Sequence, residues 1–199
     1  MKRIIPFIML LLISTTASAQ LFKPKENKPT DSKYLAGEVP IENNRVVFRQ
    51  NIDAPGLSSS QIMQIAQTWY KERFVEPTVI SAKEIKNDGN HTFEAKVEEY
   101  IVFKKKLFVL NRARIYYYLT LNAEDGKCEF IMSRITYWHD DENPDGGTRY
   151  NAEELITDEK AIDAEKRDKL VKTPGKFRIK TIDLKNTLFT ELTNRLKSK

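Results

Sequence analysis

The sequence predicts an α+β domain in which an antiparallel sheet of about five strands is combined with two helices. Two observations carry this prediction. Asp-Gly pairs at 88–89 and 125–126 are each flanked by β-rich segments, which indicates two hairpins. Apolar residues recur at helical spacing over 58–74 and again over 184–196, which indicates two helices with one buried face each. We therefore expect one helix after the first strand and a second helix after all the strands.

Length and composition restrict the protein to an ordinary globular class. The 199 residues are 40% hydrophobic and 31% charged, and they include only 7 glycines and 8 prolines. A chain of this size forms one domain with short additions, or at most two small domains. The balance of apolar and charged residues excludes disordered, collagen-like and multi-pass membrane proteins.

Residues 1–19 have the pattern of a signal peptide. Lys2 and Arg3 precede an apolar stretch at 4–13, and Ala17-Ser18-Ala19 provides small residues at a cleavage site before Gln20. The apolar stretch is about half of the roughly 20 residues that span a bilayer. No cysteine follows the cleavage site to carry a lipid. We expect a protein exported to the periplasm or beyond, soluble after cleavage and without a transmembrane segment.

The charge of the mature chain does not favour nucleic acid as a partner. Removal of Lys2 and Arg3 leaves 31 basic against 28 acidic residues, a net charge of +3. A nucleic-acid-binding protein would concentrate more basic charge on one face. The run at 104–106 is the one cluster of lysines, and a solvated strand end or an anionic surface such as lipid head groups or a glycan would account for it.

The elements before the hairpins can be assigned in chain order. Residues 20–33 are polar and contain prolines, so they are expected to form a flexible arm, and a single domain occupies 34–199. A strand at 45–52 ends in the Asp53–Gly56 turn. The helix at 58–74 begins with a capping box, in which Ser58 stands three residues before Gln61.

The second hairpin has a register that can be written from its turn. With Asp125-Gly126 at the tip, one face of the hairpin is almost entirely apolar, and the single cysteine, Cys128, lies on it. Burial raises the pKa of a thiol, so we expect Cys128 to be inert. The predicted pairs are Glu124 with Lys127, Ala123 with Cys128, Leu121 with Phe130, Leu119 with Met132, and Tyr117 with Arg134.

The first hairpin and the later helices complete the prediction. Two short charged helices are expected at 151–154 and 158–169, and the last helix is expected to begin at Thr181 or Asp183. With Asp88-Gly89 at its tip, the first hairpin is predicted to pair Ile80 with Val97, Ala82 with Ala95, and Glu84 with Phe93.

Strand alternation predicts a second face of the sheet that is rich in aromatic residues. Tyr116 and Tyr118 point away from Tyr117, and Ile135 and Tyr137 are expected beside them. A face this apolar either packs against another element of the domain or takes a partner protein, a peptide or a glycan.

Two charged residues fall on the predicted core face. The alternation places Glu99 beside Val97 and Ile101, and it places Arg134 opposite Tyr117. Each could lie at a bulge or a strand end, or the two could form a polar pair inside the groove of the sheet.

Six short segments follow one another in a fixed order, at 34–40, 115–117, 134–138, 146–147, 156–159 and 175–183. Together they resemble an exported bacterial family known as a domain of unknown function with a TBP-like fold. The resemblance covers about residues 34–196 and implies a curved antiparallel sheet with helices packed on one face. It implies no activity, cofactor or catalytic residue.

The motifs that would indicate catalysis or a cofactor are absent from the sequence. There is no nucleophile elbow, phosphate loop or dinucleotide fingerprint, and the two histidines, His91 and His139, lack partners at metal-ligand spacing. Asp141, Asn143 and Asp145 match the opening of a calcium loop. That loop lacks its twelfth-position Glu, since Ala152 stands there, so we expect a solvated turn and no metal or cofactor.

The sequence therefore predicts a binding module of the cell envelope and not an enzyme. Its partner would be an envelope protein, a peptide or a glycan bound on the open sheet face. The alternative is a carrier of a small apolar ligand between the sheet and the helices, which would need a continuous internal cavity. A hydrolase would need a pocket in which Glu99, Arg134 or the loop at 139–145 converge. The candidate site residues are Tyr116, Tyr118, Tyr137, Ile135, Arg134 and Glu99.

Overall fold

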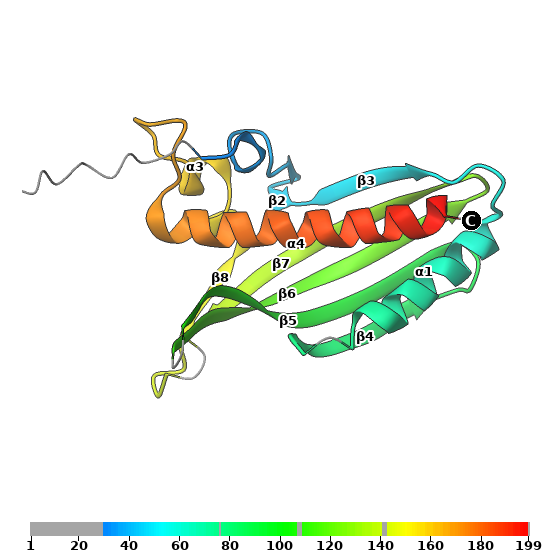
Figure 1. Ribbon diagram of the computed structural model, residues 1–199, viewed down its shortest axis with the longest axis horizontal. Helices are drawn as coiled ribbons and strands as arrows, with labels where there is room; N and C mark the ends of the chain where they lie inside the picture. The colour runs from blue at the N-terminus through cyan, green and yellow to red at the C-terminus, as the bar shows by residue number, and fades with distance from the viewer. Residues whose placement is uncertain (1–29, 76, 107–108, 141–142, 199) are drawn as a thin grey trace, which may run out of the picture.

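The computed structural model is an antiparallel sheet with two long helices, α1 and α4, on one of its faces (Figure 1). It describes residues 30–75, 77–106, 109–140 and 143–198. The predicted signal peptide at 1–19 and most of the predicted arm lie outside this part of the chain. Ser32–Tyr34 form a 3-10 turn, η1, which begins within the last residues of the predicted arm.

The main sheet has six strands in the order β3-β7-β6-β5-β4, with β8 also paired to β7. The five predicted strands are therefore joined by β8, and the predicted strand at 45–52 is interrupted at Val47 into β2 and β3. A separate two-stranded ribbon is formed by β1 and β2. The strands are β1 (Ile41–Glu42), β2 (Arg45–Val46), β3 (Phe48–Asp53), β4 (Val79–Asn87), β5 (Thr92–Lys106), β6 (Val109–Glu124), β7 (Lys127–His139) and β8 (Thr148–Asn151).

The register of the β6-β7 hairpin is as predicted next to its turn and differs beyond it. The pairs from Glu124 with Lys127 to Leu119 with Met132 are confirmed. The predicted pair of Tyr117 with Arg134 does not form, because Tyr118 pairs with Ser133 and Tyr116 pairs with Thr136. The extra residue on β7 is a β-bulge at Arg134, whose φ is +53°.

The register predicted for the β4-β5 hairpin is wrong. Ala82 pairs with Val97 and Glu84 pairs with Ala95, and β4 has irregularities near 80 and 85. The turn is wider than the two residues assumed, since the Asp88 carboxylate accepts backbone N–H groups from Asn90, His91 and Thr92 at 2.7–3.0 Å. The side chain thus builds a local turn that shifts the strands relative to one another.

Helix α1 (Ser59–Arg73) begins where its capping box predicts. The Ser58 hydroxyl accepts from the Gln61 N–H at 3.3 Å, and the Gln61 side chain accepts from the Ser58 N–H at 2.8 Å. The buried face of α1 carries the predicted stripe, including Ile62, Ala66 and Trp69.

Helix α4 (Lys172–Lys197) begins nine residues before Thr181, the earlier of its two predicted starts. Pro174 stands in the first turn, where a missing backbone N–H costs nothing. Gly175 follows in close contact with Leu170, since a Cβ at Gly175 would lie 2.5 Å from the Leu170 Cβ. The sequence prediction began this helix at its first apolar repeat. It left out the preceding turns, in which Pro174 lies near the helix start and Gly175 allows close packing.

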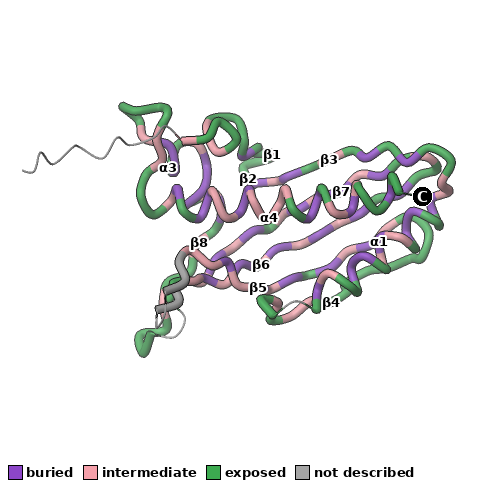
Figure 2. The backbone as a smooth tube through the Cα atoms, in the orientation of Figure 1, coloured by how far each residue is buried: buried purple, intermediate pink, exposed green. Residues whose placement is uncertain are grey.

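The core lies between the sheet and the two helices (Figure 2). Tyr117, Leu119 and Met132 are fully buried there, and Cys128 is buried with them as predicted. The opposite face of the sheet carries no helix among the described residues, and most of its side chains are half-buried or exposed.

Arg178 on α4 connects the chain segments near Tyr34, Ile156 and Asp158, which form one corner of the molecule beyond the sheet. Its side chain is fully buried. It donates to the carbonyls of Tyr34 at 2.6 Å, Ile156 at 2.7 Å and Leu35, and it lies 2.7 Å from a carboxylate oxygen of Asp158. Three of the segments that carried the family resemblance therefore meet at one guanidinium.

The two short helices near this corner are α2 (Ala152–Leu155) and α3 (Asp158–Ala161). The second is shorter than the predicted 158–169, because the chain turns at Asp163, which pairs its backbone with Lys169. None of the helices in the described part of the chain is long and apolar enough to cross a membrane.

Candidate functional site

The bulge at Arg134 changes which predicted site residues lie on the open face. Tyr116 and Tyr118 are half-buried there, as expected. Ile135 and Tyr137 are not on that face: each is only 1% exposed on the core side, where the Tyr137 hydroxyl lies 2.7 Å from the Thr181 hydroxyl of α4. One extra residue in a strand reverses the facing of every residue after it, so the prediction for these two residues was wrong.

Four residues cross the open face as one row of direct strand partners. Tyr100 on β5 pairs with Arg114 on β6, Arg114 with Trp138 on β7, and Trp138 with Arg149 on β8. Rings and guanidinium groups alternate along this row. The Arg114 guanidinium lies 4.9 Å from the Trp138 ring centroid and 5.8 Å from that of Tyr100, and the Arg149 guanidinium lies 4.1 Å from that of Trp138. We call these four residues the transverse row.

Similar contacts extend the pattern to both sides of the transverse row. Arg112 lies 3.8 Å from the Tyr100 ring, Arg134 lies 4.7 Å from the Tyr118 ring, and Arg149 also lies 6.0 Å from the Tyr116 ring. We call the whole surface the arginine–aromatic face. It consists of Tyr100, Arg112, Arg114, Tyr116, Tyr118, Arg134, Trp138 and Arg149.

Acidic side chains lie among the arginines of this face. Glu98 pairs with Arg114 at 3.0 Å, and Glu94 lies 4.0 Å from Arg134, at the limit of an ion pair. Burial, followed by the hydrogen bond and charge of Glu98, raises the pKa of Tyr116, so its hydroxyl stays protonated at neutral pH. Arg149 contributes a further cation to this surface, next to the rings of Trp138 and Tyr116.

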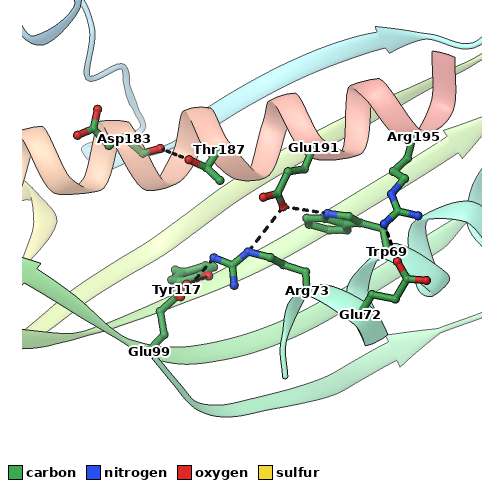
Figure 3. Close-up of polar contacts among 9 residues, drawn as sticks. All are labelled: Trp69, Glu72, Arg73, Glu99, Tyr117, Asp183, Thr187, Glu191 and Arg195. Atoms are coloured by element: carbon green, nitrogen blue, oxygen red, sulfur yellow. Dashed lines mark hydrogen bonds and ion pairs between the residues drawn. The ribbon is translucent and has the colours of Figure 1, made fainter. Parts of the chain in front are cut away.

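Glu99 points into the core, as the alternation of β5 predicts, and its partners there are not Arg134. The Tyr117 hydroxyl donates to one carboxylate oxygen, and Arg73 of α1 donates to the other at 3.4 Å (Figure 3). Arg73 also lies 3.6 Å from Glu191 of α4, which accepts from the Trp69 indole N–H at 3.2 Å. This inner network connects the sheet to both helices.

The inner network stabilises the fold. Glu99 is 3% exposed, and burial together with the Glu99 charge raises the pKa of Tyr117 well above its ordinary value, so the hydroxyl remains a donor. The sequence offered a buried polar pair or a bulge for these two residues. Glu99 belongs to a buried polar network, whereas Arg134 lies at a bulge with its side chain 70% exposed.

The calcium-like loop is an ordinary turn in the part that is described. Asp141 lies outside the described residues. The Asn143 amide oxygen accepts from the Asp145 N–H at 3.3 Å, and the Trp138 indole donates to the Gly146 carbonyl at 2.7 Å, which holds the loop against β7. Among the described residues, no three His, Cys, Asp or Glu side chains are grouped as a metal site would require.

Four of the pockets over the described residues open at the surface. One, of about 510 Å³, lies at the edge of β7 next to Arg134. Two lie along α1 and α4, and one lies near the turn of the β6-β7 hairpin. The buried core contributes one lining residue to each of three of these pockets, Ile135, Trp69 and Cys128, and their other lining residues lie outside it.

Five of the eight residues of the arginine–aromatic face were not predicted from the sequence. They are Tyr100, Arg112, Arg114, Trp138 and Arg149. The spacing of the apolar residues Phe130, Met132, Ile135 and Tyr137 contains the signal, since one interval of three between intervals of two marks a bulge. With that bulge, Trp138 moves to the open face and aligns with Arg114.

Comparisons with known proteins agree with this architecture. A family described as a domain of unknown function (DUF4468) with TBP-like fold matches residues 48–138. The crystal structure of a DUF4468 family protein from Bacteroides ovatus is 30% identical, with a TM-score of 0.75 over 85% of this chain and 96% of that one. A TBP-like protein from Parabacteroides distasonis shares the fold at 19% identity, with a TM-score of 0.63 over 80% and 97% of the two chains. A search of curated proteins finds no match. The chain therefore belongs to the DUF4468 family and has the TBP-like fold of that family.

Proposed function

We propose that this protein is an exported, non-enzymatic binding module that docks an acidic protein partner on its arginine–aromatic face. The observation that carries the proposal is the transverse row, in which two guanidinium groups alternate with two aromatic rings across four strands. The leader pattern at 1–19 supports export to the periplasm or beyond.

The geometry of the row favours a carboxylate as the group that binds. The Arg149 guanidinium, which lies 4.1 Å from the Trp138 ring centroid, has lost much of its freedom before the partner arrives, and a guanidinium is suited to engage a carboxylate bidentately. The edges of aromatic rings carry partial positive charge and also attract anions.

The same geometry favours a protein over a neutral glycan. A sugar stacks on a bare ring face, whereas the rings of Tyr100 and Trp138 each have a guanidinium within 4.1 Å of the centroid. Trp, Tyr and Arg are also the residues that dominate the binding energy of protein interfaces. We do not extend the proposal to carriage of an apolar ligand, which would require an internal cavity.

Titration with poly-L-glutamate tests the proposal, with the fluorescence of Trp138 as the signal. The chain has 2 tryptophans, and a Trp138→Phe variant identifies the part of the signal that comes from the open face. We expect binding at low salt that weakens as salt is added. Arg149→Gln should weaken binding by about tenfold, which corresponds to one charge-assisted contact.

The control variant is Arg195→Gln, which removes an exposed arginine of α4 that pairs with Glu72 at 2.6 Å. This variant should bind poly-L-glutamate like the unmodified protein. Equal loss in Arg195→Gln and Arg149→Gln would reduce the effect to net charge and overturn the proposed site. Tighter binding of polygalacturonate than of poly-L-glutamate would overturn the choice of a protein partner.

A further inference from the structure

Arg149 on β8 is exposed, and among the described residues no carboxylate forms an ion pair with it. Arg114 of the same face differs, since it pairs with Glu98 at 3.0 Å. The contacts of Arg149 are with aromatic rings, at 4.1 Å from the centroid of Trp138 and 6.0 Å from that of Tyr116. Its charge is therefore open to an anion from solvent, and the ring of Trp138 is its nearest support.

The ring of Trp138 is itself held by the chain that connects β7 to β8. The indole N–H donates to the Gly146 carbonyl at 2.7 Å. An indole has this single polar group, so one bond fixes the orientation of the ring and leaves no donor for a partner. Trp138 and Arg149 are also direct strand partners. The ring and the guanidinium thus come from facing positions of one hairpin.

Gly147 determines where the Gly146 carbonyl lies. The φ of Gly147 is +66°, in the region that favours glycine. A Cβ at this position would lie 2.4 Å from the carbonyl oxygens of both His139 and Asp140. The obstacle is backbone, so no rotation of a side chain can make room. Glycine therefore lets the two ends of the β7-β8 connection touch, and Gly146 is carried with them toward Trp138.

We infer that Trp138 and Gly147 are positioning residues, which hold Arg149 in place for a carboxylate of the acidic partner. Gly147 allows the close turn, the turn supplies the carbonyl that orients the indole, and the indole supports the guanidinium. An arginine that is ordered in advance loses less conformational entropy when it binds an anion. This inference rests on the proposed function, because it explains how that binding site is organised before the partner arrives.

The attachment of β8 to the sheet does not depend on the Trp138 bond. Four strand pairs join β8 to β7, and Tyr150 of β8 points to the core, where its ring centroid lies 6.4 Å from that of Phe177 on α4. The indole bond lies on the opposite face of the sheet. Its loss should therefore release Arg149 while the strand stays in place.

The order of the Arg149 side chain tests the inference without any ligand. Relaxation of the Arg149 Nε–Hε group by NMR reports how rigidly the guanidinium is held. We expect an ordered group in the unmodified protein. In Trp138→Phe, which keeps a ring but removes the indole N–H, and in Gly147→Ala the order parameter should fall below about 0.6, the range of flexible groups. Circular dichroism checks that both variants are folded.

Two matched variants control for general effects of these substitutions. Trp69→Phe removes the other indole N–H of the chain, which donates to Glu191 on the core side. Gly89→Ala places alanine at a similar φ of +78°, where a Cβ has nothing within 4 Å. Both controls should leave the Arg149 Nε–Hε group ordered. Equal loss of order in a control and in its matched variant would overturn the inference.

A double-mutant cycle tests whether Trp138 acts through Arg149. Calorimetric titration with poly-L-glutamate is used, because Trp138→Phe removes the fluorescent group. We expect Trp138→Phe to weaken binding by about threefold, the effect of ordering one side chain. In Arg149→Gln the same change should have no further effect, since no guanidinium is left to position. Losses that add in the double variant would show that Trp138 contacts the partner directly and would overturn the inference.

The outcomes separate this inference from the proposed function. An Arg149 side chain that stays ordered in both Trp138→Phe and Gly147→Ala, or one that is already flexible in the unmodified protein, overturns the inference. The proposed function then stands if Arg149→Gln still weakens binding of poly-L-glutamate. Unchanged binding by Arg149→Gln overturns the proposed function, and with it the role inferred for the two positioning residues.

Discussion

At the scale of single residues, the least expected feature is a carboxylate in the centre of an apolar face. Glu99 is stable there because Tyr117 donates to one oxygen and Arg73 to the other. A buried ion pair adds little net stability compared with well-packed apolar residues, but the loss of one partner leaves a charge without compensation. The pair therefore restricts how α1 can sit on the sheet.

Removal of Arg73 is expected to cost more than neutralisation of Glu99. Arg73→Met leaves the Glu99 charge unpaired and should lower the free energy of unfolding by about 3 kcal/mol, whereas Glu99→Gln should lower it by about 1 kcal/mol. Urea denaturation of both variants and of the double variant measures the coupling. Glu72→Gln, in an exposed pair, should change stability by less than about 0.5 kcal/mol. Additive effects of the two core variants would show that Arg73 and Glu99 do not interact.

The buried thiol predicts how stability depends on alkaline pH. Burial raises the pKa of Cys128 from 9.0 to about 12. Above pH 9 the unfolded chain releases the thiol proton while the folded chain keeps it, so the unfolded state gains stability as pH rises. Cys128 alone should reduce the free energy of unfolding by about 2 kcal/mol between about pH 8 and about pH 10.5.

Tyr117 and Tyr137 act in the same direction at higher pH, because burial raises the pKa of each hydroxyl. Urea denaturation of the unmodified protein and of Cys128→Ala over this pH range measures the contribution of the thiol. The variant should show a shallower decline up to about pH 10, the ordinary pKa of tyrosine. Parallel pH profiles would exclude a role for Cys128.

At the scale of elements, strand β7 shows what a periodic pattern can and cannot predict. The pattern gave the correct facing of Phe130 and Met132, which precede the bulge, and the wrong facing of Ile135 and Tyr137, which follow it. The alternation of apolar and polar residues predicts which face of the sheet each side chain occupies. That prediction is valid only while both strands advance residue for residue. The interval of three between Met132 and Ile135 was the local sign that this condition fails.

Deletion of Arg134 tests this account of the strand. Without the bulge, Ile135 and Tyr137 would turn to the open face and Trp138 would turn to the core, so we expect loss of the cooperative unfolding transition. Arg134→Gly keeps the bulge and should be as stable as the unmodified protein or more stable. Circular dichroism during thermal unfolding distinguishes the two. A deletion variant with an unchanged transition would mean that the strand can absorb the lost residue elsewhere.

The entry of α4 gives a second test at this scale. Alanine is the better helix former by about 1 kcal/mol, yet in Gly175→Ala the new Cβ would lie 2.5 Å from the Leu170 Cβ. We expect Gly175→Ala to lower the melting temperature, because the collision outweighs the propensity. Lys176→Ala, at an exposed position of the same turn, should leave the melting temperature unchanged or raise it slightly. A higher melting temperature for Gly175→Ala would show that Leu170 can move away without cost.

At the scale of the whole molecule, Arg178 connects parts that local patterns could not join. The sequence predicted the helices, the hairpins and their order, since each depends on residues close in the chain. It did not predict that Tyr34, Ile156 and α4 meet at one buried guanidinium, because such a contact depends on the path of the chain in space. The open face was anticipated in the same partial way: Tyr116 and Tyr118 were found, and the arginines from β6 and β8 were not.

Replacement of Arg178 should destabilise this corner of the molecule more than it destabilises the sheet. Arg178→Met leaves three carbonyls without their donor and Asp158 without its ion-pair partner, which we expect to cost about 3–5 kcal/mol. Hydrogen exchange should accelerate at 30–39 and 152–162 while the β5-β6 amides remain protected. Lys176→Met, at an exposed site of the same helix, serves as the comparison. Uniform acceleration over the whole chain would show that the corner and the sheet unfold together.

The position of α4 in the chain also affects how the protein is made. This helix covers the core face of the sheet, but it follows every strand in the sequence. During synthesis, α1 can cover its own part of the apolar side of the sheet, but the part that α4 covers stays open until residues 172–197 leave the ribosome. The nascent chain therefore passes through a long stage that is prone to aggregate, in which a chaperone would have to shield the surface that α4 later occupies.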